Sequence, residues 1–355
     1  MAFGTIVTLT LLPVLIFALW HLTSTMLPPM PALLRNKRII LLVAHPDDES
    51  MFFSPTLQAL THPSLQNHLK ILCMSTGNSE GLGATRKLEL EKAAMTLGLR
   101  RKEDVFVLDD ERFKDGMKEE WKAEDIALVL ASAFAPHLNS SSTASAPTTP
   151  AHDSSDKEKD KQDRRKSKSS SVKHTKSSSR NSISATATPP AAPAQKETIG
   201  PRATIDVLVT FDKGGISGHP NHIALYHGAS LFLQKIMRGY SGYACPVTLY
   251  TLPSINIVRK YSFVIDAVPT LLVGIYESIF GNIFGLTKEK GKTATGPKGA
   301  ADRVMFVNDI FRYWKAREAM IHGHKSQMVW FRWGWIGLGR YMVVNDLRRE
   351  RVIAS

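Results

Sequence analysis

Residues 38–49 read R-I-I-L-L-V-A-H-P-D-D-E, an apolar run followed at once by a histidine and three carboxylates. The apolar run is typical of a strand buried inside a parallel sheet. Pro46 prevents the strand from continuing, so the polar cluster falls at its carboxyl end, where open α/β sheets carry their sites. Such crowding of acidic groups is unfavourable unless a cation or a proton-transfer role compensates it. An acidic surface loop is the alternative that this stretch alone leaves open. The cluster comprises His45, Asp47, Asp48 and Glu49.

A second stretch has the same design. Residues 204–222 read T-I-D-V-L-V-T-F-D-K-G-G-I-S-G-H-P-N-H, an apolar run, a glycine-rich turn and then histidines. His219 and His222 are three residues apart, which places both near one point at the start of a helix. A zinc hydrolase needs three histidine or carboxylate ligands and one open position for water. The two strand-end clusters together can supply that set.

These motifs also carry a family resemblance. A-H-P-D-D-E after a strand and G-H-P-N-H further on resemble the LmbE-like/PIG-L family of zinc-dependent N-acetylglucosamine deacetylases. Residues 211–226 are similar in sequence to the eukaryotic branch of the family; they read F-D-K-G-G-I-S-G-H-P-N-H-I-A-L-Y. That branch acts on GlcNAc-phosphatidylinositol in glycosylphosphatidylinositol (GPI) anchor biosynthesis. The resemblance covers residues 38–135 and 203–350. It implies an α/β fold, with a Rossmann-like, mostly parallel sheet and helices on both faces.

The resemblance also implies roles for individual residues. A zinc ion, or another divalent metal, is implied at three ligands, which are His45, Asp48 and His222. Asp47 is implied to be the general base, and His219 the donor that stabilises the oxyanion. Glu49 and Asn221 are implied to orient the imidazoles and the carboxylate that bind the metal, without binding it themselves. Bacterial members often carry Asp at the position of Asn221, so the eukaryotic branch is the better match here.

Two further motifs extend this set. Residues 83–89, G-A-T-R-K-L-E, resemble the family's G-x-x-R-x-x-E, which implies that Arg86 binds the substrate and is a candidate contact for the inositol phosphate. A surface salt bridge between Arg86 and Glu89 is the alternative. Residues 324–327, H-K-S-Q, resemble the family's H-x-S-Q, which implies that His324 supports the site without ligating the metal. A surface histidine at a helix end is the alternative there.

The first 34 residues contain no Asp, Glu, Lys or Arg. Their apolar run is long enough to cross a bilayer core of about 30 Å as a helix. A cleaved signal peptide would need a basic start and a small-residue cleavage site, and neither is evident. Arg35, Lys37 and Arg38 follow the run, so the positive-inside rule predicts a single-pass anchor with the catalytic domain in the cytosol. The resemblance implies the endoplasmic reticulum membrane.

Residues 139–200 differ from the rest in composition, because Ser, Thr, Ala, Pro and Lys dominate them. We expect a disordered insert that divides the deacetylase domain into residues 35–138 and 201–355. Residues 156–180 hold ten Lys or Arg against four Asp or Glu, so about +6 of the net charge of +13 lies in this insert. The basic balance therefore gives no indication of nucleic-acid binding by the folded domain.

Periodicity predicts the remaining elements. We expect strands at 38–43, 69–74, 104–108, 203–211 and 247–252, and helices at 49–59, 84–97, 121–136, 223–237 and 304–320. Residues 268–286 are apolar except for Glu277, and this Glu and three glycines favour an interfacial or re-entrant helix over a second membrane span. The aromatic and basic residues of 330–341 suit either a membrane interface or core packing.

The expected function is metal-dependent hydrolysis of the acetamide of membrane-embedded GlcNAc-phosphatidylinositol, giving GlcN-phosphatidylinositol and acetate. The lipid-linked substrate and the membrane are thus the expected partners. Three alternatives stay open: a deacetylase of another, soluble GlcNAc conjugate, a non-catalytic membrane scaffold, and a nucleic-acid binder that uses the basic insert. The N-terminal apolar run speaks against the first, the complete set of candidate ligands against the second, and the lack of a base-reading motif against the third.

Overall fold

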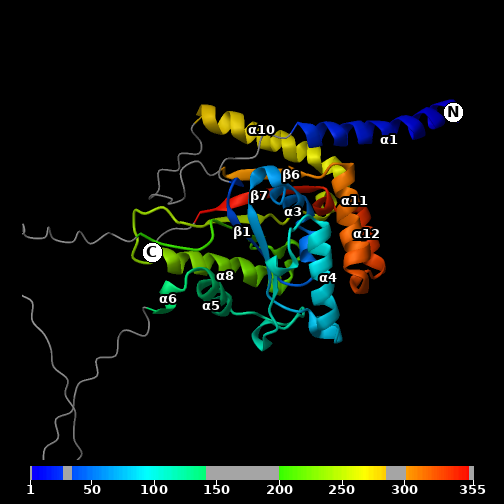
Figure 1. Cartoon of the computed structure of the whole chain (residues 1–355). Coiled ribbons are helices and arrows are strands. Elements are labelled where there is room, and N and C mark those ends of the chain that lie inside the picture. Colours follow the sequence, from blue (N-terminus) through cyan, green and yellow to red (C-terminus); the bar gives the residue numbers. More distant parts are fainter. Residues whose placement is uncertain (1, 27–33, 141–199, 285–300, 352–355) are drawn as a thin grey trace, which may run out of the picture. The chain divides into compact units, whose positions relative to one another are not determined.

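A single seven-stranded sheet in the order β3-β2-β1-β4-β5-β7-β6 organises the chain (Figure 1). The computed structural model describes residues 2–26, 34–140, 200–284 and 301–351. The strands are β1 (Arg38–Val43), β2 (His68–Cys73), β3 (Val105–Val107), β4 (Val207–Phe211), β5 (Thr248–Leu252), β6 (Arg303–Val307) and β7 (Val344–Glu350). Strands β1 to β5 are parallel, and β7 runs antiparallel to both of its neighbours. The predicted mostly parallel α/β sheet is confirmed.

The centre of the sheet forms because β1 and β4 are apolar on both faces. Every residue of 39–43 and of 207–211 is buried. Strand β1 pairs with β2 on one side and with β4 on the other, so the segments before residue 141 and after residue 199 build one sheet. The insert predicted at 139–200 lies almost entirely outside the described residues. Cys73 and Cys245 are buried free thiols.

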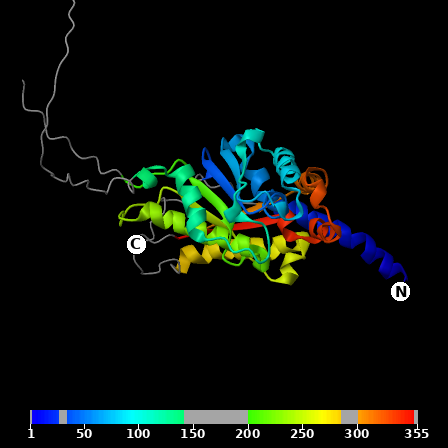
Figure 2. The same cartoon turned by 90° about the horizontal axis from the view of Figure 1, so that it is seen from below.

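Helices cover both faces of this sheet. Helices α3 (Ser54–Leu60), α4 (Gly83–Thr96) and α11 (Ile310–Glu318) pack on one face, and α5 (Ala123–Phe134) and α8 (Pro220–Met237) pack together on the other (Figures 1 and 2). The strand order reverses between β1 and β4, because the chain leaves β1 toward β2 and later returns to its other side. In open α/β sheets this reversal opens a crevice at the carboxyl ends of the strands.

Two of the predicted helices are wrong in detail. The helix expected at 304–320 is in fact strand β6 followed by α11, because residues 303–307 pair with β7, a strand that was not predicted. Asp309 then begins α11 by accepting a hydrogen bond from the backbone N–H of Arg312. The helix expected at 49–59 is divided into α2 (Asp48–Met51) and α3, with Pro55 in the first turn of α3. Proline favours that position because it lacks an N–H.

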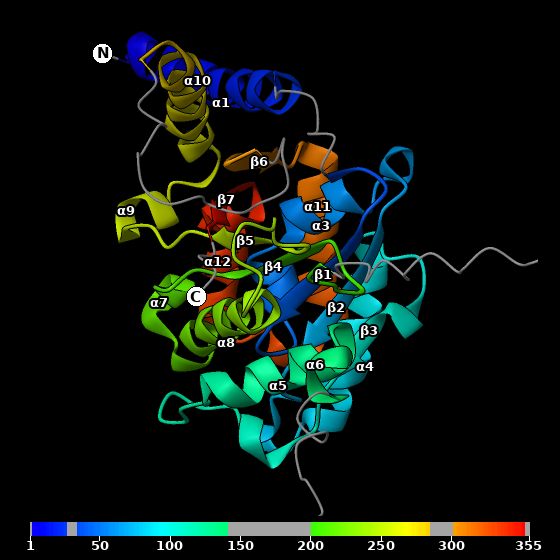
Figure 3. The same cartoon turned by 90° about the vertical axis from the view of Figure 1, so that its left-hand side faces the viewer.

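Helix α1 (Ala2–Thr25) lies beside α10 (Ala267–Phe284) at the β6 edge of the sheet (Figure 3). Trp20 fixes α1 there, since its Nε1–H donates to the Asn308 carbonyl at 2.6 Å and its ring packs edge-on against Phe263 and Tyr313. Within the described residues, no helix has the combined length and apolar character that a membrane crossing requires. The transmembrane helix expected in residues 1–34 is therefore not confirmed.

Candidate active site and metal centre

The strand-end motifs meet at the β1/β4 reversal. His45 follows β1, Asp48 begins α2, and His222 lies in the first turn of α8. Ligand-capable atoms of these three residues all lie within 4.8 Å of one another, and all three side chains are buried. The sequence separates His45 from His222 by more than 170 residues, so the pairing of β1 with β4 is what brings the predicted ligands together.

Asp48 is oriented by the backbone before it. Its Oδ2 accepts hydrogen bonds from the N–H groups of Ala44 at 3.0 Å and His45 at 2.9 Å, while its Oδ1 lies 3.2 Å from Nε2 of His222. Burial alone would raise the pKa of Asp48, but the charge of His222, with the other groups around the carboxylate, outweighs burial and holds that pKa below its ordinary value. The carboxylate is therefore ionised and aimed at the histidines.

His222 is held by its surroundings on three sides. Its Nδ1 lies 3.2 Å from the carbonyl oxygen of Gly215, which leaves Nε2 to face Asp48. The imidazole stacks on the Phe211 ring with centroids 3.9 Å apart and planes 3° apart. Gly215 has a φ of +58°, and a Cβ there would lie 3.1 Å from the Cβ of His222. Glycine is thus required at 215 for the turn to approach this closely.

The ring nitrogens fit a divalent cation. Nε2 of His45 and Nε2 of His222 are buried, and among the described residues neither makes a hydrogen bond of good geometry. Buried polar atoms of this kind normally have a partner, and two such nitrogens around one ionised carboxylate form a donor set that Zn²⁺ uses. Iron, cobalt and manganese accept the same ligands. The residues present therefore fit the metal that the family resemblance implies.

His219 is placed beside these ligands but is not in the same group. Its ring centroid lies 5.0 Å from that of His45 and 4.8 Å from that of His222. Burial, followed by the charges of His222 and His45, lowers the pKa of His219 to about 4, so the ring is neutral at pH 7. Its Nδ1 accepts the backbone N–H of Asn221 at 3.3 Å, which leaves the ring proton on Nε2.

Asp47 is buried between two guanidinium groups. Its carboxylate Oδ2 lies 3.5 Å from Nη2 of Arg86 and accepts a short hydrogen bond from Nη1 of Arg332. The backbone of Asp47 has a φ of 114°, an uncommon conformation for a residue with a side chain. The Asp47 N–H donates to Oε2 of Glu49 at 3.1 Å and so holds this turn. Backbone outliers of this kind cluster at functional sites.

The supporting residues act on different partners. Glu49 and His324 form a fully buried pair with Oε1 and Nε2 2.6 Å apart, so His324 supports the turn that carries Asp47. The side chain of Asn221 donates from Nδ2 to the carbonyl of Lys114 at 3.2 Å. It therefore anchors the loop that carries Asp115, and it does not bond to an imidazole. The roles predicted for Glu49 and Asn221 as orienters of metal ligands stay predictions.

Arg86 is buried, and its guanidinium bonds several segments of the site. Nη1 donates to the carbonyl of Gly77 at 2.6 Å and to Asp115 at 3.2 Å, and Nη2 donates to the carbonyl of Pro46 at 2.9 Å. The alternative surface pair with Glu89 is not formed, because the Glu89 carboxylate accepts from Ser326 instead. The geometry thus gives Arg86 a positioning role inside the site, and its contact with substrate stays a prediction.

Sequence reasoning missed two charged residues of this site. Asp115 lies in the loop before α5, with its Oδ1 3.2 Å from Nε2 of His45, and it forms a second possible ligand group with His45 and His219. In the sequence, Arg332 stands out only as part of the aromatic and basic stretch 330–341. Neither residue carries a local signal in the sequence, because each reaches the site from a distant loop or helix.

A polar pocket of about 530 Å³ opens beside Asp115. Hydroxyl, amide and carboxylate groups line it, which suits a ligand rich in hydroxyl groups. They include Ser75, Thr76, Asn78, Asp109, Asp110 and Glu119.

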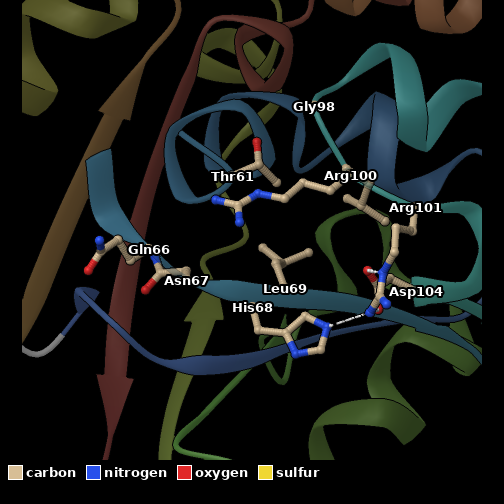
Figure 4. Close-up of a pocket in the computed structure, with 10 residues that line it drawn as sticks. Thr61, Gln66, Asn67, His68, Leu69, Gly98, Arg100, Arg101 and Asp104 are labelled. Atoms are coloured by element: carbon tan, nitrogen blue, oxygen red, sulfur yellow. Dashed lines mark hydrogen bonds and ion pairs between the residues drawn. The ribbon is translucent and has the colours of Figure 1, made fainter. Parts of the chain in front are cut away.

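A second pocket, of about 290 Å³, lies at the amino end of β2, at the opposite end of the strands (Figure 4). There His68 and Arg101 are paired with Asp104 at 2.9 and 3.2 Å, and Arg100 reaches across the pocket. Of these two pockets, the first adjoins the candidate ligands and the second does not.

The model of the PIG-L family, described as GlcNAc-PI de-N-acetylase, matches residues 40–232, more than half of the chain. The chain belongs to the PIG-L family. A curated relative from Arthroderma benhamiae, N-acetylglucosaminyl-phosphatidylinositol de-N-acetylase, is 40% identical over 98% of this chain and 98% of its own length. The Saccharomyces cerevisiae protein of the same name is 29% identical over 87% of this chain and 80% of its own length.

Among solved structures, N,N'-diacetylchitobiose deacetylase from Pyrococcus horikoshii is similar with a TM-score of 0.41 and 12% identity, covering 89% of this chain and 84% of that one. Membership of the PIG-L family thus rests on the family model and the curated relatives.

Proposed function

We propose that this protein removes the N-acetyl group from GlcNAc-phosphatidylinositol, giving GlcN-phosphatidylinositol and acetate, which is the second step of GPI-anchor biosynthesis. Family membership and the names of the curated relatives support this substrate. The observation that carries the chemistry is the buried group of His45, Asp48 and His222 beside the carboxylate of Asp47. A metal-dependent amide hydrolase needs such a combination of metal ligands and a proton acceptor.

His45, Asp48 and His222 would hold the divalent cation. When bound there, the cation polarises the acetamide carbonyl and lowers the pKa of water. Asp47 takes the proton of the attacking water at a carboxylate oxygen as the new carbon–oxygen bond forms. The neutral His219 donates its Nε2–H to the oxyanion. The proton held by Asp47 then passes to the leaving nitrogen as the carbon–nitrogen bond breaks, which releases acetate and the free amine.

The assay that tests this function measures acetate release by the purified full-length chain from GlcNAc-phosphatidylinositol in detergent. We expect release that a chelator abolishes and that Zn²⁺ restores. Activity that survives complete metal removal would refute the metal centre. Turnover of a soluble GlcNAc conjugate without turnover of the lipid-linked substrate would keep the deacetylase chemistry and refute the proposed substrate.

We further propose that residues 1–34 anchor the protein in the endoplasmic reticulum membrane, with the sheet on the cytosolic side. The absence of Asp, Glu, Lys and Arg from this segment, and the basic residues that follow it, support the proposal. Large apolar side chains exposed on α1 support it as well, and α10, beside α1, adds others. On α1 they are Leu11, Leu12, Val14, Leu15, Phe17 and Leu22.

Replacing Leu11 and Leu15 together by lysine is expected to reduce membrane retention strongly. Both side chains are exposed, at 52% and 63%, so the fold should tolerate the change. Each lysine costs about 2.5 to 3.5 kcal/mol at the centre of a membrane helix. The measurement is the fraction of protein that stays with membranes after alkaline carbonate extraction. A matched control replaces Leu88 and Leu128, exposed on α4 and α5, by lysine. Retention equal to wild type in the α1 variant would contradict the proposed anchor.

A further inference from the structure

Helix α12 (Trp330–Leu338) connects the surface of the protein with the catalytic carboxylate. Its inner face holds Trp335 and Ile336, which are buried, and Arg332 lies one turn earlier on the same face. Its other faces expose Trp330, Phe331 and Trp333, at 85%, 54% and 49%. A short helix with tryptophans exposed on one side and an arginine directed inward is unusual for a surface that meets only water.

Trp335 fixes this helix against the metal-binding turn. Its Nε1–H donates to the carbonyl of Met51 at 3.1 Å, and its ring packs edge-on against Phe52 with centroids 5.2 Å apart. Met51 ends α2, the helix that begins at the ligand Asp48. Because Trp335 is anchored there, the guanidinium of Arg332 reaches Asp47, which immediately precedes α2.

The two arginines that meet Asp47 differ in how firmly they are held. The guanidinium of Arg86 also bonds two backbone carbonyls and Asp115, and its side chain is 7% exposed. Among the described residues, Asp47 is the one side-chain hydrogen-bond partner of Arg332, whose Nε is buried without a partner and whose side chain is 17% exposed. Arg332 can therefore change its partner without loss of backbone contacts, whereas Arg86 cannot.

We propose that Arg332 binds the phosphodiester of the lipid-linked substrate and exchanges the Asp47 carboxylate for it; this inference rests on the proposed function. In such a substrate the acetamide belongs to the sugar, the inositol and phosphodiester follow, and the acyl chains come last. The site presents matching groups in the same order, from the Asp47 carboxylate through Arg332 to the exposed aromatic side chains of α12. The planar guanidinium suits an anionic phosphodiester with two hydrogen bonds.

The charges around Arg332 favour an exchange of this kind. Burial lowers its pKa, but Asp47, then Asp48 and Asp115, outweigh burial and raise that pKa, so the guanidinium keeps its charge. All three carboxylates lie toward the interior of the site. These carboxylates repel an anion, so approach of the phosphodiester to Arg332 from the side of the exposed aromatic residues of α12 is favoured. Release of Asp47 from Arg332 then frees the carboxylate to accept a proton when substrate is bound.

The test compares Arg332→Gln with wild type on three substrates. They are GlcNAc-phosphatidylinositol, GlcNAc-inositol phosphate without acyl chains, and GlcNAc-inositol without phosphate. We expect kcat/KM to fall by about 10- to 100-fold on the two phosphate-bearing substrates, the range of a charge-assisted hydrogen bond, and to change little on the third. Most of the loss should be in KM. Arg332→Lys should retain part of the activity, because lysine keeps the positive charge but lacks the paired N–H donors with which a guanidinium bonds two phosphate oxygens.

Arg100→Gln, in the pocket at the other end of the sheet, is the matched control, and thermal unfolding of each variant verifies the fold. An equal loss on all three substrates would show that Arg332 only positions Asp47, and no loss on any would exclude the contact. A loss confined to the acylated substrate would assign the effect to the lipid chains and overturn the inference. If the wild-type chain deacetylates none of the three, the proposed function itself fails, which is a distinct result.

Discussion

Replacing His222 by alanine is expected to remove bound metal and to lower deacetylation by about 1000-fold or more. The imidazole presents its buried Nε2 to Oδ1 of Asp48 at 3.2 Å, so its loss leaves one histidine and one carboxylate for the cation. Two ligands are too few for a catalytic zinc site, which uses three protein ligands. The metal content per chain after dialysis and the rate of acetate release are the two measurements.

His227→Ala is the matched control for this variant. His227 lies on the same helix, α8, but its side chain is exposed, so both metal content and activity should stay at the wild-type level. A His222→Ala protein that still binds one metal ion per chain would transfer the site to the second group, His45, Asp115 and His219. A variant without metal but with full activity would refute metal-dependent hydrolysis.

The parts of the site that could be predicted are those encoded locally. His45, Asp48 and His222 come after apolar runs that are typical of buried strands, and parallel strands bring their carboxyl ends to one edge of a sheet. The two short motifs therefore predict which clusters of histidines and carboxylates meet, and the family resemblance implies which of these residues hold the metal. The family resemblance added roles that spacing alone does not give, such as the difference between Asp47 and Asp48. In the structure Asp48 faces His222 whereas Asp47 faces two arginines, and the separate roles of the two carboxylates stay predictions.

The features that could not be predicted depend on contacts between distant segments. The pairing of β6 with β7 overrides the helical periodicity of residues 304–320, since strand preference depends on packing against neighbouring strands and on burial more than on local pattern. Asp115 enters the site because Asn221 and Arg86 hold its loop, and Arg332 enters because Trp335 docks on α2. Each of these contacts joins segments that no local pattern relates. The sequence therefore predicts the candidate metal ligands better than it predicts the charged residues that surround them.

Asp47→Asn is expected to lower kcat by about 100- to 10,000-fold, the usual contribution of a general base, with the metal content unchanged. Asparagine has the size of aspartate and tolerates a positive φ, so the turn at 114° should persist. It can still accept a hydrogen bond from Arg332, but it cannot take a proton from water. Metal content, kcat and thermal unfolding are measured together. The control is Asp125→Asn, because Asp125 lies on α5 and its carboxylate is paired with Arg112.

The metal content decides between the possible roles of Asp47. Loss of the metal from Asp47→Asn would make Asp47 a ligand, and unchanged kcat would exclude it as the base. The double variant with Arg332→Gln then separates the two functions of the pair. On the phosphate-free substrate, the double variant should be no slower than Asp47→Asn alone, because Arg332 has no phosphate to bind there. On the lipid-linked substrate the combined loss should be smaller than the product of the two single losses, because Arg332 and Asp47 are in contact and binding of the phosphodiester by Arg332 acts in part by freeing the Asp47 carboxylate.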